Sequence, residues 1–332
     1  FKQGGSGFTT EYDAILAAGT TNGYTLPSAG EQDTQNTLIE NLKAYGLWDG
    51  IDAMFYFKGS GDSDFKGINW KNPTSNITTE IGVGTLVYST TGLKGDDINY
   101  LDLGWTPTVD AVNYTQSDFG FVWEIVTAEV NDNSLLETTG TDGSITKLFA
   151  GGTWQSLHSL SNSSRDIFNG GQVGVNVAEL LTDTIYSGLN GGTVKVAGGK
   201  TPAIISDQTY KLFKNGSTGR GDCEVGLFVI GASLGGVQAK HLDFTNAVNG
   251  IAPPTGYDTD TQAFIDAVNS ESGVTLTWAQ EVVLDDLVVG LKNNGTWSKY
   301  YAIYPYIGGT ATSHKWNLKE PQDLDSSYRG IF

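Results

Sequence analysis

The chain has 332 residues, and its 19 basic and 37 acidic side chains give a formal net charge of −18. Because so acidic a surface repels phosphate groups, we expect neither nucleic acid nor an anionic membrane as a partner. Its single cysteine, Cys223, excludes an intrachain disulfide and a cysteine-based zinc site. No apolar run approaches the ~20 residues that cross a bilayer, so membrane insertion is not expected.

Two helices are predicted near the start of the chain. The first lies around 13–18, and the second runs from Ser28 to Gly46. Ser28 and Glu31 have the spacing of a capping box, and glycine is the residue type favoured just past a helix end. The second helix carries an apolar stripe made of Leu38, Ile39, Leu42 and Tyr45.

The middle of the chain, 80–250, reads as strands without intervening helices. Glycine (44 residues) and aromatic side chains (11%) are abundant here and elsewhere, which favours short strands joined by turns. We expect strands at 119–126, 145–149, 173–177, 193–196, 210–213 and 225–230. Many short strands in succession predict an antiparallel sandwich.

The end of the chain repeats its start. Leu42–Trp48 (LKAYGLW) returns as Leu291–Trp297 (LKNNGTW), and Asn69–Pro73 (NWKNP) returns as Asn317–Pro321 (NLKEP). The same signals surround the second copy: a short helix at 261–268, a capping pattern at Thr277 and Gln280, and a glycine stop at Gly295. Shared features in one order indicate a duplicated helical module.

This repeat divides the chain into three predicted parts. They are a helical connector module at 1–79, a β-sandwich at 80–250, and a second copy of the connector at 251–332. We expect the second connector to be the start of a further domain in a longer parent polypeptide.

Several segments resemble known families. Gly95–Pro107, Tyr210–Gly216 and Leu227–Ala232 resemble strands and a hairpin of concanavalin- or laminin-G-like jelly rolls. Trp297–Ala311 with His314–Pro321 is similar to a segment that precedes such a jelly roll in tail or fibre proteins of tailed phages. The first connector departs from that pattern, because Tyr56 stands where the second has Pro305.

The resemblance implies a mainly β protein, an antiparallel jelly-roll sandwich flanked by two short helical modules. It also implies a structural or adhesive component of the virion, the extracellular phage particle, rather than an enzyme. Its expected partners are other virion proteins, further copies of itself in a homo-oligomer, and glycans of a host surface touched by the sandwich loops.

Two enzymatic alternatives remain open. Gly231-Ala232-Ser233-Leu234-Gly235 fits the G-x-S-x-G pattern of a nucleophile elbow, and His314 follows at a workable distance for a serine esterase. The elbow requires a parallel sheet with crossover helices, whereas we expect only a short helix at 237–241, so an ordinary glycine-rich turn is favoured. The other alternative is a free module that binds or degrades carbohydrate.

Ligand candidates are of two kinds. The aromatic side chains that could stack on sugars, if exposed, are Trp105, Trp154 and Tyr186. The acidic loop residues that could offer oxygen atoms to Ca²⁺, the one cofactor considered, are Asp62, Asp64, Asp96, Asp97 and Asp102. Core packing is the alternative for the first set, and solvated turns are the alternative for the second.

Overall fold

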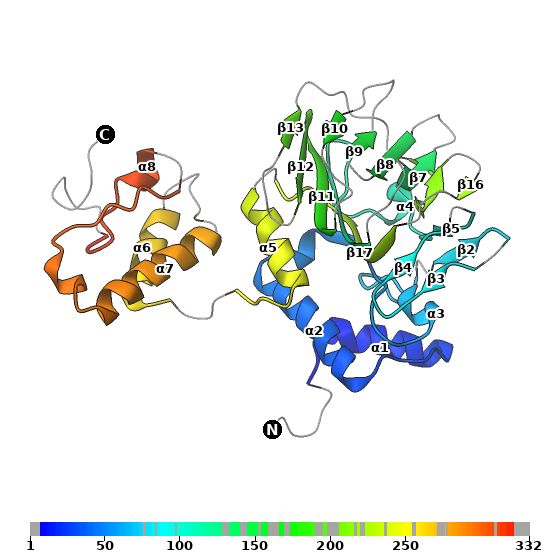
Figure 1. The fold of residues 1–332 in the computed structure, drawn as a ribbon, viewed down its shortest axis with the longest axis horizontal. Coiled ribbons are helices and arrows are strands. Elements are labelled where there is room, and N and C mark those ends of the chain that lie inside the picture. The colour runs from blue at the N-terminus through cyan, green and yellow to red at the C-terminus, as the bar shows by residue number, and fades with distance from the viewer. Residues whose placement is uncertain are drawn as a thin grey trace. The chain divides into compact units, whose positions relative to one another are not determined.

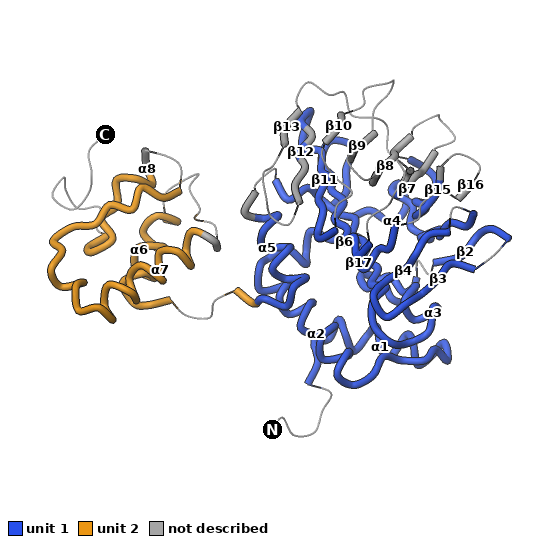
Figure 2. The backbone as a smooth tube through the Cα atoms, viewed as in Figure 1, with its two compact units in different colours: residues 1–251 blue, residues 252–332 orange. Residues whose placement is uncertain are grey.

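A computed structural model gives the fold. The residues that it describes are 7–75, 78–83, 85–96, 98–127, 133–139, 145–151, 154–158, 166–168, 173–189, 195–197, 206–215, 218–219, 223–235, 238–253, 257–270, 276, 278–308 and 311–321. The chain divides into two compact units, unit 1 (1–251) and unit 2 (252–332), shown in different colours in Figure 2.

Unit 1 is built mainly from two antiparallel sheets (Figure 1). The strands of the first sheet follow the order β13 (Lys195–Ala197), β12 (Thr184–Leu189), β11 (Gly174–Leu181), β6 (Asp118–Thr127), β17 (Glu224–Gly231), β4 (Leu93–Lys94) and β3 (Val87–Tyr88), and β1 (Ile51–Tyr56) also pairs with β17. The order in the second sheet is β10 (Asp166–Phe168), β9 (Trp154–His158), β8 (Ile145–Gly151), β7 (Asn133–Thr139), β14 (Lys211–Leu212), β5 (Tyr100–Asp102) and β2 (Thr79–Ile81). A separate hairpin joins β15 (Lys214–Asn215) to β16 (Thr218–Gly219).

The two sheets enclose one hydrophobic core. Phe121 and Trp123 of β6 and Phe228 of β17 enter it from the first sheet, and Leu101 and Leu212 enter it from the second. Because side chains alternate along a strand, every second residue of β6 from Phe119 to Ile125 faces this core, as do Phe228 and Ile230 of β17, and the residues between them face away from it. The prediction of a mainly β, antiparallel fold with helices is confirmed.

Helices cover parts of unit 1. They are α1 (Thr10–Asn22), α2 (Ala29–Ala44), the 3₁₀ turn η1 (Trp48–Gly50), α3 (Ser63–Lys66), α4 (Pro107–Asp110) and α5 (Gln238–Val248). The predicted capping box of α2 is confirmed, since the Ser28 backbone donates to Glu31 and the Ser28 side chain caps the helix in return. Among the residues described, no helix is long and apolar enough to span a bilayer.

The first connector is joined to the sandwich rather than separate from it. Its strand β1 pairs antiparallel with β17, and the Asp52 carboxylate accepts hydrogen bonds from the backbone N–H groups of Asn113 and Tyr114 at 2.7–3.0 Å. The predicted boundary at residue 79 therefore falls inside unit 1, because the connector completes one edge of the first sheet.

A buried asparagine organises this first module (residues 9–72). Asn69 Oδ1 accepts hydrogen bonds from the backbone N–H groups of Met54, at 3.0 Å, and Lys71, at 3.1 Å. The Lys71 ammonium then donates to the Trp48 carbonyl at 2.8 Å and lies over the Trp48 ring. These contacts hold one edge of β1 against the segment that follows it.

The second module (residues 258–320) repeats the same contacts in unit 2. Asn317 Oδ1 accepts from Ile303 at 3.0 Å and from Lys319 at 3.1 Å, and the Lys319 ammonium donates to the Trp297 carbonyl at 3.1 Å. Its elements are α6 (Thr259–Asn269), α7 (Trp278–Asn293), the 3₁₀ turn η2 (Trp297–Lys299) and α8 (Ala311–His314). The repeat seen in the sequence therefore extends to individual hydrogen bonds.

The helix stops also agree between the two modules. Gly46 and Gly295 both have φ of +66°, and each donates its backbone N–H to the carbonyl of the lysine three residues before it. Glycine is favoured there because a residue with a Cβ is strained in this left-handed conformation. The predicted ends of both helices are confirmed, while Thr277 of the second capping pattern lies outside the described residues.

Candidate functional site

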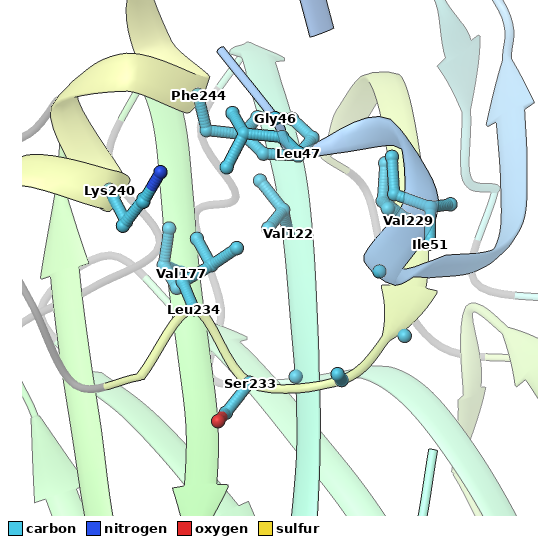
Figure 3. A pocket seen from close by; sticks show the side chains of 14 residues that line it. Gly46, Leu47, Ile51, Val122, Val177, Val229, Ser233, Leu234, Lys240 and Phe244 are labelled. Carbon is cyan, nitrogen blue, oxygen red and sulfur yellow. The ribbon is translucent and has the colours of Figure 1, made fainter. Parts of the chain in front are cut away.

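A cavity of about 150 Å³ lies on the face of the first sheet that points away from the sandwich core. Val122, Val177 and Val229 form its floor, and they alternate along their strands with residues that enter the core. The segment Gly46–Ile51 of the first module and Phe244 of α5 enclose it (Figure 3). Three separate parts of unit 1 therefore meet at this cavity.

The polar groups of this cavity are few and already engaged. The Lys240 ammonium donates to the Tyr45 carbonyl at 3.3 Å, and the Ser233 backbone N–H donates to Asp118 at 2.8 Å. Figure 3 shows the Ser233 hydroxyl directed away from Lys240 and Phe244. An apolar chamber with one lysine at its border is suited to packing, not to acid–base chemistry.

A buried polar pair lies beside the cavity. His241 Nε2 of α5 and Glu179 Oε1 of β11 are 2.8 Å apart, and both side chains are fully buried. Glu179 also accepts a hydrogen bond from the Leu234 backbone N–H. Since unpaired polar groups are costly inside a protein, this pair fixes α5 and the turn after β17 to the sheet.

Sequence analysis did not identify this pair. Glu179 is the lone acidic residue in the run Gly174–Leu181, which is otherwise mostly apolar, and it occupies the same strand face as Val175 and Val177. A carboxylate in such a strand signals a buried partner.

The structure does not support a nucleophile elbow at Ser233. The serine follows β17, which has only antiparallel neighbours, and it is absent from the described non-glycine residues with positive φ, which are Thr182, Phe213 and Tyr306. A nucleophile elbow is a strained turn that follows a strand of an α/β-hydrolase sheet. The expected short helix at 237–241 was wrong, because α5 continues to Val248.

The proposed partner of Ser233 belongs to the other unit. His314 ends α8 of unit 2, where its ring lies 5.8 Å from the Tyr306 ring, edge to face. The two residues of the esterase alternative therefore belong to separate compact units.

The aromatic candidates have different outcomes. Trp105 takes the alternative role of a core residue, because it is fully buried in the sandwich core and stacks on Tyr210 with ring centroids 5.7 Å apart. Tyr186 on β12 is half-buried and stays a candidate. Trp154 lies on β9, and its side chain is outside the described part of the chain.

The acidic candidates mostly satisfy backbone groups. Asp62 caps α3 by accepting from Phe65, and Asp96 accepts from Ile98 and Asn99. Burial alone would raise the pKa of Asp96, but these hydrogen bonds outweigh it and hold the pKa below its usual range. Asp97 lies outside the described residues.

The remaining acidic candidates, Asp64 and Asp102, also have structural positions within unit 1. Asp64 lies in the first turn of α3, and Asp102 accepts from Thr209 at 2.8 Å and lies 3.5 Å from the Lys211 ammonium. Over the part of the chain that is described, no group of three or more His, Cys, Asp or Glu side chains could hold a metal ion.

Comparisons with known proteins give distant structural matches. No protein-family model matches the chain, and no curated protein matches it. A structure of Trypanosoma rangeli sialidase in complex with sialic acid aligns at 9% identity over 68% of this chain and 39% of its own, with a TM-score of 0.45. This chain thus spans only about two fifths of the sialidase.

Two smaller domains align similarly. Domain 4 of AbnA, a GH43 extracellular arabinanase from Geobacillus stearothermophilus, aligns at 13% identity over 59% of this chain and 98% of its own, with a TM-score of 0.42. The binding domain of botulinum neurotoxin serotype D aligns at 9% identity over 62% and 52%, also with a TM-score of 0.42. Similarity at this level carries no argument about function.

Proposed function

We propose that this protein is a structural and adhesive component of a tailed-phage virion, in which helical connector modules join β-sandwiches of the concanavalin or laminin-G jelly-roll type. The observation that carries the proposal is the repetition of the connector, hydrogen bond for hydrogen bond, around Asn69 and Asn317. Repeated units that contact their neighbours in sequence are typical of elongated scaffolds, in which length and surface matter more than one catalytic centre.

The first module supports this role by its position. It contributes β1 to the sandwich sheet and anchors Asp52 to the loop at Asn113, so it serves as a built-in joint rather than a loose linker. The sandwich loops are then the surfaces available for host glycans, with Tyr186 as the remaining described aromatic candidate. Other virion proteins and further copies of the chain are its proposed partners in the particle.

Mass spectrometry of particles purified from the source of the gene tests the virion role. We expect peptides of this chain to copurify with the capsid and tail proteins through a density gradient. Light scattering on the purified chain tests the homo-oligomer. A chain that is absent from the particles, and a strict monomer in solution, would contradict the proposal.

Two further assays separate adhesion from catalysis. A fluorophosphonate probe should leave the chain unlabelled, whereas labelling that disappears in the Ser233→Ala variant would favour the esterase alternative. A glycan array, followed by product analysis of every bound glycan, should show binding without cleavage. Released sugar products would instead favour the carbohydrate-degrading alternative.

A further inference from the structure

The strand of the first module has two hydrogen-bonding edges, and both are occupied. One edge faces its own module, where Met54 accepts from the Trp70 backbone N–H at 2.8 Å as well as donating to Asn69. The other edge faces β17, with Phe55 opposite Phe228 and Ala53 opposite Ile230. Because the Phe57 N–H donates to the Gly226 carbonyl at 2.9 Å, these alternate pairs are the hydrogen-bonded ones.

The second module contains an equivalent segment without strand pairing, and one of its edges is open among the residues described. The two copies of the module are offset by a constant number of residues: Trp48 corresponds to Trp297, and Met54 corresponds to Ile303. With this offset, 300–305 aligns with β1. Ile303 is hydrogen-bonded on the inner edge, the edge that faces its own module, since its carbonyl accepts from the Leu318 N–H at 2.8 Å.

Within the described part of the chain, no strand pairs with the outer edge of this segment. Ala302 and Tyr304 take the places of Ala53 and Phe55, and their backbone groups have no hydrogen-bond partner among the residues described.

The side chains of this segment show the same difference. Ala53 and Phe55 are fully buried in the sandwich core, whereas Ala302 is exposed and Tyr304 is only half-buried. Beside them, Tyr301 is 100% exposed. An unpaired edge bordered by exposed aromatic side chains is a template for strand addition.

Pro305 is compatible with pairing along this edge. It stands where Tyr56 stands in β1, opposite Leu227, a position between the hydrogen-bonded pairs. The N–H group that proline lacks would therefore point away from the partner strand. Proline at this position therefore removes no backbone donor from the outer edge, the edge that would pair with a partner strand.

A second surface beside this segment is also uncovered. In the first module Leu38 of α2 is buried, α5 packs against α2, and Leu38 shares a cavity wall with Ala247 of α5. The equivalent Leu287 of α7 is 40% exposed, and Val283, one turn before it, is 64% exposed. Among the residues of unit 2 that the structure describes, none forms a counterpart of β17 or of α5.

We propose that the second module docks onto a separate β-sandwich domain, which supplies an edge strand placed like β17 and a helix placed like α5. The strand would pair with 300–305, and the helix would cover Leu287 and Val283. The sandwich of unit 1 is not this partner, because β1 and β4 already occupy that edge of its β17. The inference goes beyond the virion role and rests on the module geometry alone.

The structure also specifies the chemistry of the partner. Gly231 of β17 lies so close to the first module that a Cβ there would stand 2.2 Å from the Gly50 oxygen, so the partner strand needs glycine at the matching position. Tyr301 replaces Asp52, which accepts from the Asn113 loop. The partner loop therefore presents an apolar surface to an aromatic ring, not free N–H donors.

A peptide probe tests the open edge on the full chain. The probe carries the β17 sequence, residues 224–231, between solubilising lysines, and amide hydrogen exchange reads its effect. We expect protection of Ala302 and Tyr304 to rise at least about tenfold when the peptide binds, because new backbone hydrogen bonds close their N–H groups. Residues 51–56 are already paired and should not change.

Methylated peptides supply the matched control without altering the protein. A peptide N-methylated at the positions of Phe228 and Ile230 loses the donors that face the open edge, and it should give no protection. A peptide N-methylated at the positions of Leu227 and Val229 keeps those donors and should protect as the parent does.

Three outcomes would overturn the proposal. They are an absence of protection by the parent peptide, equal protection by both methylated peptides, and concentration-dependent protection of 300–305 in the chain alone. The last would mean that the edge pairs with a second copy of this chain. None of the three bears on whether the chain is found in virions.

Discussion

Replacing Asn69 by alanine should destabilise unit 1 by about 2–4 kcal/mol. The side chain is fully buried, and its Oδ1 is the acceptor for two backbone N–H groups, those of Met54 and Lys71. A buried donor left without a partner costs about 1–3 kcal/mol, and Met54 is itself fully buried. Lys71 is half-buried, so water can satisfy part of its loss, and the smaller side chain adds a small cavity term.

The equivalent change, Asn317→Ala, should cost unit 2 less, about 1–2 kcal/mol. Ile303, the donor to Asn317, is only half-buried, so water can reach its N–H group more easily. Urea unfolding followed by hydrogen exchange reports each unit separately, and Asn22→Ala and Asn293→Ala, both at exposed positions, are the matched controls. Equal and small losses, below about 0.5 kcal/mol at both sites, would refute the reasoning.

Three further changes test other contacts. Gly231→Ala should destabilise unit 1 by about 3 kcal/mol in urea unfolding, the upper end for overpacking, because the added methyl group collides with backbone; Gly30→Ala, which meets nothing, is its control. His241→Ala should cost about 3–5 kcal/mol in the same assay, because it leaves the buried Glu179 without its imidazole partner; a loss below 1 kcal/mol would contradict a structural pair. Hydrogen bonds from serine hydroxyls lower the pKa of Glu31 to about 2, so its contribution is complete above pH 4.5 and is lost as the pH falls towards 2; acid titration of Glu31→Gln should show a flatter decline over that window than the parent chain.

The module repeat could be predicted from sequence because its signals are local. The capping box at Ser28 and the glycine stops at Gly46 and Gly295 act within one or two helical turns, so each can be identified without knowledge of the fold. The antiparallel class was predictable for the same reason, since it follows from strand length and turn composition. Pairing partners such as β1 and β17 lie far apart along the chain, and composition does not encode them.

What the sequence left open or missed has one physical cause. Trp105 was left open between sugar stacking and core packing, because indole area is as useful in a core as on a surface and only its neighbours decide its role. The helix after Ser233 was predicted to end at residue 241, before Leu242, Asp243 and Phe244. Packing of Phe244 and His241 against the sheet instead carries α5 through to Val248.

The two modules share their internal contacts and differ where they meet a sandwich. Asn69 and Asn317 perform the same internal task, whereas Asp52, which binds the Asn113 loop, is replaced by the exposed Tyr301. If the first sandwich received the second module, the backbone donors of its loop would lose their carboxylate acceptor, a loss that penalises the wrong pairing. The hydrogen bonds shared around Asn69 and Asn317 thus maintain the fold of each connector. The residues that differ on the surface facing a sandwich, such as Asp52 and Tyr301, determine which sandwich each connector can join.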